Sequence, residues 1–565
     1  MMNKALIKYI PAASWLPNYQ KQDLQGDLIA GITVAVMLVP QGMAYAMLAG
    51  LPPIIGLYAS IVPLLIYALF GTSRQLAVGP VAIVSLMTAT GIGGVISGAS
   101  IETYIAYAVL LALMVGVIQL AMGIAKVGFL VTFLSHPVIS GFTSAAALII
   151  GFSQLKHLLG LDIPRSHHIH EIIMNAAGQW DQSHVTTLLI GLGSVTLLLL
   201  LKRWSPMFPA ALVVVLLSTL AVWGFDLHEQ GVKIVGDVPA GFPSPQLPMI
   251  SFDAMSALLP TAIVISLISF MESISVAKAF ARKNKYDVSP NQELIGLGLA
   301  NIAGSFFKAY PVTGGFSRTA VNGQAGANTP LASIITAAVI SVVLIFFTPL
   351  FYFLPKAVLA AIIMTAVFGL IDWKEAKHLL HVKRSDFAAM MVTFFATLSL
   401  GIEKGILLGV AISLLWIIIR SSRPHTAILG RIPGTQIYRN LEKYPDAEQE
   451  DGILVMRVDA QFYFGNATYL KELINRYINE SATPVNTVVI EAASINQIDS
   501  SADAELQGII EELKSKNIEL YFANVKYPVM EVMIKSGLKD LVGGDKFFLS
   551  LHDAVLQAKS MYLAK

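Results

Sequence analysis

Two stretches of the sequence place glycine or proline directly before a short helical segment. They are Ala77-Val-Gly-Pro-Val81 and Pro311-Val-Thr-Gly-Gly-Phe-Ser-Arg318, and they occupy corresponding places in the two halves of a long apolar region. Two helix N-termini that point at each other concentrate backbone N–H groups and positive dipole ends on one spot, which suits an anion. Pro80 can start a helix, because proline at a first helical position loses no hydrogen bond. A simple kink is the alternative for Gly79-Pro80. The matching second stretch weakens that alternative.

Ser317 and Arg318 add polar groups at the start of the second segment. Ser317 offers both a hydroxyl and a backbone N–H group. Arg318 carries a permanent positive charge, which we expect to contribute to the electrostatic field of the site rather than to bind in a bidentate manner. The alternative for Arg318 is a structural counter-ion, or a surface side chain that extends its charged end to water.

Glu272 is an ionisable residue inside the apolar stretch Ile268-Ser-Phe-Met-Glu-Ser-Ile-Ser275. An acidic residue within a membrane-spanning helix is costly, which makes it a functional candidate. Burial disfavours the charged form of a carboxyl group, so Glu272 could take up and release a proton. Pairing with Lys278 or Arg282 is the structural alternative.

The composition indicates the elements that must hold these residues. Of the 565 residues, 55% are hydrophobic and only 13% are charged, whereas soluble domains carry about 25% charged residues. About fourteen hydrophobic segments lie between Leu28 and Ile419, some of them too short to span a bilayer alone. The net charge of +2 gives no reason to expect nucleic-acid binding, and the absence of cysteine excludes disulfides and thiolate metal sites. Nothing indicates a catalytic centre or a cofactor.

Basic residues give the orientation of the apolar region. With the N-terminus in the cytoplasm, short cytoplasmic loops hold clusters of basic residues, in agreement with the positive-inside rule. These residues are Arg74, Lys126, Lys202, Arg203, Arg282, Lys283, Lys285, Lys383 and Arg384. We therefore predict a cytoplasmic segment at residues 1–27, a membrane domain at residues 28–421 and a cytoplasmic domain at residues 422–565. We expect the membrane to be the inner membrane of a bacterium.

The composition changes near Ser421, and the rest of the chain is typical of a soluble α/β domain. Short apolar runs alternate with helical stretches, which predicts a sheet covered by helices. The runs are Ile453–Val458, Thr487–Ile490 and Ile518–Phe522, and the helical stretches are Ala467–Ile478 and Ala502–Lys514. Asp499-Ser500-Ser501 follows a strand and opens a helix, where a capping role is expected.

Several motifs together resemble the sulfate permease (SulP) family of anion transporters. The signature is carried by Gly26-Asp-Leu-Ile-Ala-Gly-Ile-Thr33, Val39-Pro-Gln-Gly-Met-Ala-Tyr-Ala46, Gly56-Leu-Tyr58 and Gly71-Thr-Ser-Arg74. Gly315-Phe-Ser-Arg-Thr-Ala-Val-Asn322 is similar to the plant and fungal motif Ser-Phe-Ser-Arg-Ser-Ala-Val-Asn. Ile428-Leu-Gly-Arg-Ile-Pro-Gly-Thr435 resembles the link into a STAS domain.

The resemblance implies a polytopic α-helical membrane protein with fourteen transmembrane segments in a seven-plus-seven inverted repeat. It also implies that a core domain moves against a gate domain, that a cytoplasmic α/β STAS domain follows, and that the protein is a homodimer. The implied substrate site lies between the two half-helices and comprises Gln41, Tyr45, Gly79, Pro80, Val81, Ala82, Gly315, Phe316, Ser317 and Arg318. Gln41 and Tyr45, four residues apart on one helix face, are packing residues in the alternative. Glu272 is the implied coupling residue. In bacterial anti-sigma antagonist relatives the serine matching Ser500 is phosphorylated.

The expected function is secondary active transport of a small anion by alternating access, with sulfate and proton symport as the first choice. Bicarbonate and C4-dicarboxylates are alternative substrates, and chloride–bicarbonate exchange is an alternative activity. Sodium is the alternative coupling ion, because hydroxyl groups lie near Glu272 on Ser269, Ser273 and Ser275. A membrane-bound regulator acting through the STAS domain is a third hypothesis, but a pure anchor would not need paired half-helices.

Overall fold

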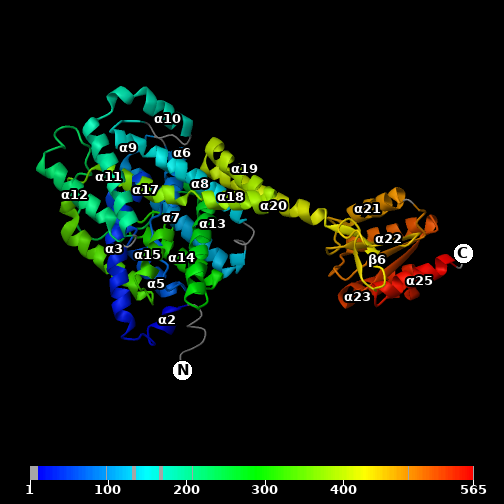
Figure 1. Cartoon of the computed structure of the whole chain (residues 1–565). Coiled ribbons are helices and arrows are strands. Elements are labelled where there is room, and N and C mark those ends of the chain that lie inside the picture. Colours follow the sequence, from blue (N-terminus) through cyan, green and yellow to red (C-terminus); the bar gives the residue numbers. More distant parts are fainter. Residues whose placement is uncertain are drawn as a thin grey trace. The chain divides into compact units, whose positions relative to one another are not determined.

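The computed structural model describes residues 10–96, 98–129, 135–163, 169–205, 208–481 and 483–563. Residues 1–9 of the expected N-terminal segment lie outside these ranges. The chain divides into two compact units, Met1–Ser413 and Leu414–Lys565. The division falls within helix α20, and each unit is described by itself (Figure 1).

The first unit is a bundle of helices with one very short two-stranded sheet. Its first half contains α2 (Ala12–Trp15), α3 (Asp23–Leu48), α4 (Pro53–Tyr58), α5 (Val62–Phe70), β1 (Val78–Gly79), α6 (Ala82–Val95), α7 (Ile101–Ile124), α8 (His136–Ser153), α9 (Leu155–Leu159), α10 (Ile169–Gly178), α11 (Val185–Trp204) and α12 (Ala210–Gly224). Its second half contains α13 (Phe252–Lys283), α14 (Pro290–Ser305), β2 (Thr313–Gly314), α15 (Phe316–Gln324), α16 (Leu331–Val342), α17 (Lys356–Val367), α18 (Trp373–Val382), α19 (Arg384–Leu400) and the first part of α20 (Ile402–Ser422).

Apolar length identifies the membrane-spanning elements. Nine helical segments in the described part of the chain are long and apolar enough to cross a membrane. Among them are α3, α7, α11 and α13, whereas α6 and α12 are apolar but shorter. The polytopic helical membrane fold is therefore confirmed. The number of fourteen spans stays a prediction, because short helices such as α6 cannot cross a bilayer alone.

The two halves of the bundle meet at β1 and β2. The strands pair antiparallel, with Val78 opposite Gly314 and Gly79 opposite Thr313. The amide of Gly315 extends the pairing by donating to the carbonyl of Ala77 at 3.1 Å. All these residues are buried. Irregular backbone within a membrane is tolerated where it is buried in protein or lines a water-filled cavity, and the buried crossing meets the first of these conditions.

Close helix packing around this crossing depends on glycine. A Cβ atom built on Gly116 of α7 would lie 2.7 Å from the carbonyl oxygen of Gly298 on α14. One built on Gly298 would lie 2.8 Å from the carbonyl oxygen of Gly116. Small residues let helix backbones approach closely where no hydrophobic effect drives helices together. This close approach of Gly116 and Gly298 holds α14 against α7.

The second unit is the predicted sheet covered by helices, here six strands in the order β4-β3-β5-β6-β7-β8. Strands β5 to β8 are parallel, and β3 runs antiparallel to β4 and β5. The strands are β3 (Thr426–Arg431), β4 (Tyr438–Asn440), β5 (Ile453–Val458), β6 (Thr487–Glu491), β7 (Glu519–Ala523) and β8 (Phe547–Phe548). The helices are α21 (Ala467–Glu480), α22 (Ser500–Ser515), α23 (Tyr527–Lys535), α24 (Leu538–Val542) and α25 (Leu551–Leu563).

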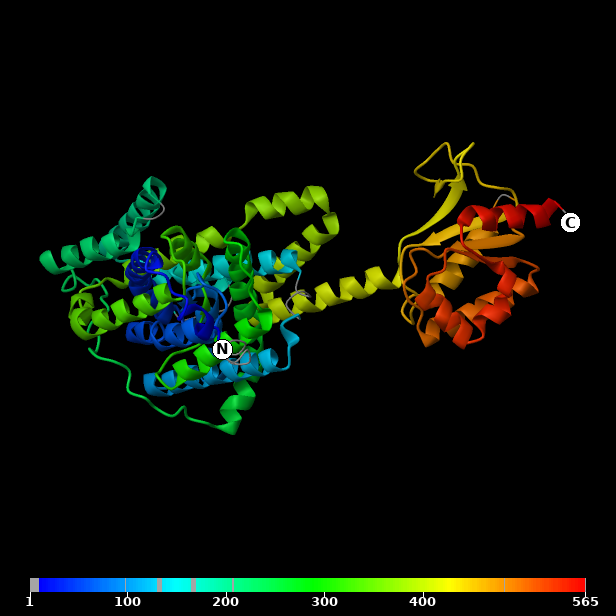
Figure 2. The same cartoon turned by 90° about the horizontal axis from the view of Figure 1, so that it is seen from below.

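Alternation along the strands builds a core on each face of this sheet. Leu454 and Met456 of β5 pack in the core that α21 to α24 cover, whereas Ile453 and Val455 pack in the core that α25 covers. Figure 2 shows α25 on the opposite face of the sheet from the other helices. A carboxylate oxygen of Asp499 accepts from the amide of Ala502 at 2.8 Å and caps α22, as expected.

Candidate anion site

Helices α6 and α15 begin directly after the paired strands β1 and β2. The residues that precede them, Val81 and Gly315, have extended backbone and make no side-chain capping hydrogen bond. The first N–H groups of a helix have no partner within the helix itself. Both half-helices therefore start at the same buried crossing without a side chain that caps their first turns.

Arg318 joins the two half-helices. It is only 1% exposed and is the largest fully buried side chain of the described residues. Its Nη1 donates to the carbonyl oxygen of Pro80. Nε and Nη2 have no hydrogen-bond partner in the described part of the chain. The alternative of a surface side chain that reaches to water is therefore wrong, and two buried donors remain available for a ligand.

Glycines make room for this guanidinium group. A Cβ atom on Gly315 would lie 2.9 Å from Nη2 of Arg318, and one on Gly79 would lie 3.4 Å from the same atom. Gly315 has φ of −93° and ψ of 130°, a conformation open to any residue. The space beside Arg318, rather than the backbone conformation, therefore explains glycine at position 315.

Three further predicted residues lie on helices α3 and α13. Gln41 and Tyr45 are buried on α3. Oε1 of Gln41 and Oε2 of Glu272 are buried without a partner among the described residues. The charge of Arg318 acts on both Tyr45 and Glu272. Within the described chain Glu272 makes no ion pair with Lys278 or Arg282.

The remaining predicted residues divide into buried and exposed ones. Pro80, Val81 and Ala82 are buried at the start of α6. Phe316 is 58% exposed, and Ser317 beside it is exposed as well. The first residues of α15 therefore face open space, while Arg318 lies beneath them.

Hydroxyl and amide groups hold strand β2, and the sequence argument considered Ser269 and Ser273 among them only as neighbours of Glu272 that could favour sodium. Ser273 Oγ lies 2.7 Å from Thr313 Oγ1 and accepts from the amide of Gly314 at 2.9 Å. Thr313 Oγ1 lies 2.6 Å from the carbonyl oxygen of Ser269. The side chain of Asn301 bonds both the amide and the carbonyl of Val312. An asparagine inside an apolar helix is the sequence signal that could have pointed to such a contact.

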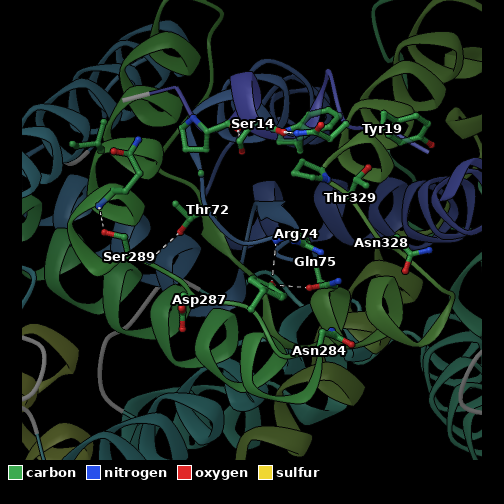
Figure 3. Close-up of a pocket in the computed structure, with 18 of the residues that line it drawn as sticks. Ser14, Tyr19, Thr72, Arg74, Gln75, Asn284, Asp287, Ser289, Asn328 and Thr329 are labelled. Carbon is green, nitrogen blue, oxygen red and sulfur yellow. Dashed lines mark hydrogen bonds between the residues drawn. The ribbon is translucent and has the colours of Figure 1, made fainter. Parts of the chain in front are cut away.

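A cavity of about 1160 Å³ lies apart from these residues (Figure 3). The residues that line it come from the N-terminal segment, from the loops that follow α5, α7, α13 and α15, and from the start of α3, the end of α7 and the first turns of α14. Ser14, Tyr19, Thr72, Arg74 and Thr329 are among them, and none of the predicted site residues is. Because Arg74 and Lys126 line it, this cavity opens on the side that the basic residues assign to the cytoplasm.

Comparison with protein families identifies both units. The sulfate permease family matches residues 24–393, and the STAS domain matches residues 444–554. Over 563 residues the chain is 42% identical to sulfate transporter 4.1, chloroplastic, of Arabidopsis thaliana, covering 96% of this chain and 82% of that protein. Over 578 residues it is 36% identical to high affinity sulfate transporter 2 of Stylosanthes hamata, covering 97% and 86%.

Solved structures share the fold. The murine anion transporter Solute Carrier 26 family member A9, in its inward-facing state, matches with a TM-score of 0.91 and 26% identity over 99% of this chain and 95% of that chain. The transmembrane domain of the cyanobacterial bicarbonate transporter BicA matches with a TM-score of 0.60 and 26% identity over 70% and 97%. The chain is a multi-pass membrane protein. The curated relatives named above are plant proteins, so the expected bacterial inner membrane finds no support in them.

Proposed function

The chain belongs to the sulfate permease family, and from this premise we propose that it carries sulfate across a membrane together with a proton, by alternating access. The family is that of sulfate transporters, which are not enzymes. The observation that supports the proposal most is Arg318, a buried guanidinium with two free donors where the half-helices meet, beside the charge of Glu272.

The site favours an anion with several oxygen acceptors. Nε and Nη2 of Arg318 and the uncapped first turns of α6 and α15 all offer N–H groups. The exposed hydroxyl of Ser317 adds one more donor. The names of the curated relatives, both sulfate transporters, favour sulfate over the bicarbonate of BicA. Hydrogen bonds donated by Arg318 to the anion then add to the electrostatic contribution that we expected from its charge.

Glu272 is the group that we propose to carry the coupled proton. Bringing a dianion next to an ionised carboxylate places like charges close together in a medium of low dielectric constant. Protonating Glu272 removes that repulsion, and releasing the proton on the other side completes the cycle. The Oγ atom of Ser273 already contacts Thr313 and Gly314, which supports a proton over sodium as the coupling ion.

The experiment that tests this function uses the purified protein in liposomes. Uptake of labelled sulfate, bicarbonate, succinate and chloride is measured under imposed pH and sodium gradients. We expect sulfate to accumulate when only a proton gradient is supplied. Accumulation of another anion with no sulfate uptake, or a strict requirement for sodium, contradicts the proposal.

A further inference from the structure

Two buried carboxylates outside the proposed site bind the backbone that leads into and out of the half-helices. They are Glu293 on α14 and Asp27 on α3, and both are 0% exposed. A buried carboxylate is stable only where hydrogen bonds or a counter-charge compensate it. Most of the groups that donate hydrogen bonds to these two carboxylates lie more than 200 residues away in the sequence. The position of these donors indicates which segment each carboxylate holds.

Glu293 fixes the loop before β1. Its Oε1 accepts from the amide of Thr72 at 2.6 Å, the hydroxyl of Thr72 at 2.7 Å and the amide of Ser73 at 3.2 Å. Its Oε2 accepts from the hydroxyl of Tyr67 at 2.6 Å. The loop continues directly through Ala77 into β1 and α6. Glu293 therefore anchors the chain that enters the first half-helix.

Asp27 does the same for the loop after α15. Its Oδ1 accepts from the amides of Asn328 and Thr329 at 2.8 and 3.0 Å, and its Oδ2 accepts from the hydroxyl of Thr329 at 2.5 Å. Tyr19 donates its hydroxyl to Oδ2 at 3.3 Å. Burial, together with the charge of Asp27, raises the pKa of Tyr19 to about 12, so this hydroxyl stays a donor at physiological pH.

The two carboxylates use the same pattern, which is two adjacent backbone amides and the hydroxyl of a threonine. Each such set is a clasp, defined here as Glu293 with Thr72 and Ser73, and Asp27 with Asn328 and Thr329. Gln75 connects them, because its Nε2 donates to the carbonyl of Ala327 at 2.9 Å in the second loop. In Figure 3, Thr72 lies on one side of the cavity, and Asn328 and Thr329 lie on the other.

We propose that Glu293 and Asp27 are positioning residues for transport. The clasps hold the two half-helices in a fixed register, so that β1 and β2 stay paired and the guanidinium of Arg318 stays at the carbonyl of Pro80. A displacement of about 0.5 Å is enough to spoil a binding constellation, and these loops have no regular secondary structure of their own to prevent it. This inference rests on the proposed function only in naming the site that the clasps position.

The test replaces clasp groups one at a time in the full-length protein. Glu293→Ala removes all four hydrogen bonds. Thr72→Val keeps the shape of the side chain and removes one of the four, together with the bond that the amide of Ser289 donates to the Thr72 hydroxyl at 3.3 Å. Glu293→Gln can keep the three bonds that Oε1 accepts. Thr393→Val is the matched control, because among the described residues the hydroxyl of Thr393 bonds the carbonyl of Ala389 in its own helix and no other group.

The first measurement is hydrogen exchange at the amides of residues 77–79 and 313–315, which does not depend on the identity of the substrate. We expect exchange there to become at least about tenfold faster in Glu293→Ala. Thr72→Val shows a smaller increase, and Glu293→Gln and Thr393→Val show none. Unchanged exchange in Thr72→Val and in any Glu293→Ala protein that folds overturns the clasp.

The second measurement is KM for whichever anion the wild-type protein carries. We expect Glu293→Ala to raise KM about tenfold or more and Thr72→Val to raise it about threefold, with Glu293→Gln restoring it. An equal fall in melting temperature for Thr72→Val and Thr393→Val, without any change in KM, reduces the clasp to a stabilising contact. If wild-type protein carries an anion other than sulfate, the proposed function fails while the clasp is still decided by these two measurements.

Discussion

At the scale of single residues, the site depends on one side chain that belongs to both halves of the molecule. Arg318 starts on the second half-helix and donates to Pro80 before the first. The sequence indicated its charge but not its burial, because burial is set by the pairing of β1 with β2. Direct hydrogen bonding requires the N–H groups of Arg318, whereas a general electrostatic field requires only its positive charge.

Arg318→Ala removes both contributions, and Arg318→Lys keeps the charge but removes the fork of donors. We predict that Arg318→Ala lowers sulfate affinity by about tenfold to a hundredfold, since a hydrogen bond to a charged group contributes about 1.5–3 kcal/mol. We expect the sulfate affinity of Arg318→Lys to lie between those of Arg318→Ala and wild type. Uptake kinetics in liposomes measure both, with melting temperature showing that the fold is intact. Wild-type affinity and rate in Arg318→Ala make the residue structural only.

Gly315→Ala tests the space beside the guanidinium. The new Cβ would lie 2.9 Å from Nη2 of Arg318, so the flexible end of that side chain must move by a few tenths of an ångström. We predict a KM several-fold above that of wild type with little change in melting temperature. Gly93→Ala on α6 is the control, because a Cβ there meets nothing within 4 Å. Equal KM values for the two variants contradict the prediction.

At the scale of elements, the sequence predicts local starts and stops better than long-range pairing. The Gly/Pro breaks placed the starts of α6 and α15, and alternating apolar runs placed β5, β6 and β7 within one residue at each end. The pairing of Val78 with Gly314 and the bonds of Glu293 to Thr72 join residues far apart in the chain. The sequence argument expected the two half-helices to meet, but no local propensity encodes such long-range contacts, so neither the pairing of β1 with β2 nor the clasps could be predicted from the sequence alone.

Asp459 in the second unit ties several strand ends together. Partial burial raises the pKa of Asp459, but hydrogen bonds from Arg457, His425 and Ser494 outweigh that effect and hold the pKa below its ordinary value of 3.8. A lowered folded-state pKa means that the stabilisation is fully present above the unfolded-state pKa and is lost as the pH falls through the folded-state value.

We therefore predict that Asp459→Asn destabilises the second unit by about 1 kcal/mol at neutral pH. The difference from wild type shrinks as the pH falls below about 3.8. Thermal unfolding of the full chain over a pH series measures this, with Asp446→Asn at an exposed position as the control. A difference that is independent of pH shows that the charge of Asp459 contributes nothing.

At the scale of the whole molecule, all the residues proposed to touch the anion belong to the first unit. Removing the chain from Pro424 onward should therefore leave the anion preference unchanged. We also expect this truncation to lower the amount of protein in the membrane. Competition between sulfate, bicarbonate, succinate and chloride in liposomes measures the preference. A changed order of preference in a well-folded truncation contradicts this division of roles.

The homodimer, the cytoplasmic termini and phosphorylation of the exposed Ser500 stay predictions.

The central claim is that Glu272 couples sulfate movement to a proton, and Glu272→Gln tests it most directly because glutamine imitates the protonated carboxyl group. Wild type, Glu272→Gln and the control Asp253→Asn, an exposed carboxylate on the same helix, are compared in liposomes with labelled sulfate and only a pH gradient. We predict that accumulation against the sulfate gradient collapses in Glu272→Gln alone, while sulfate–sulfate exchange survives. Accumulation by Glu272→Gln at the wild-type level contradicts the claim.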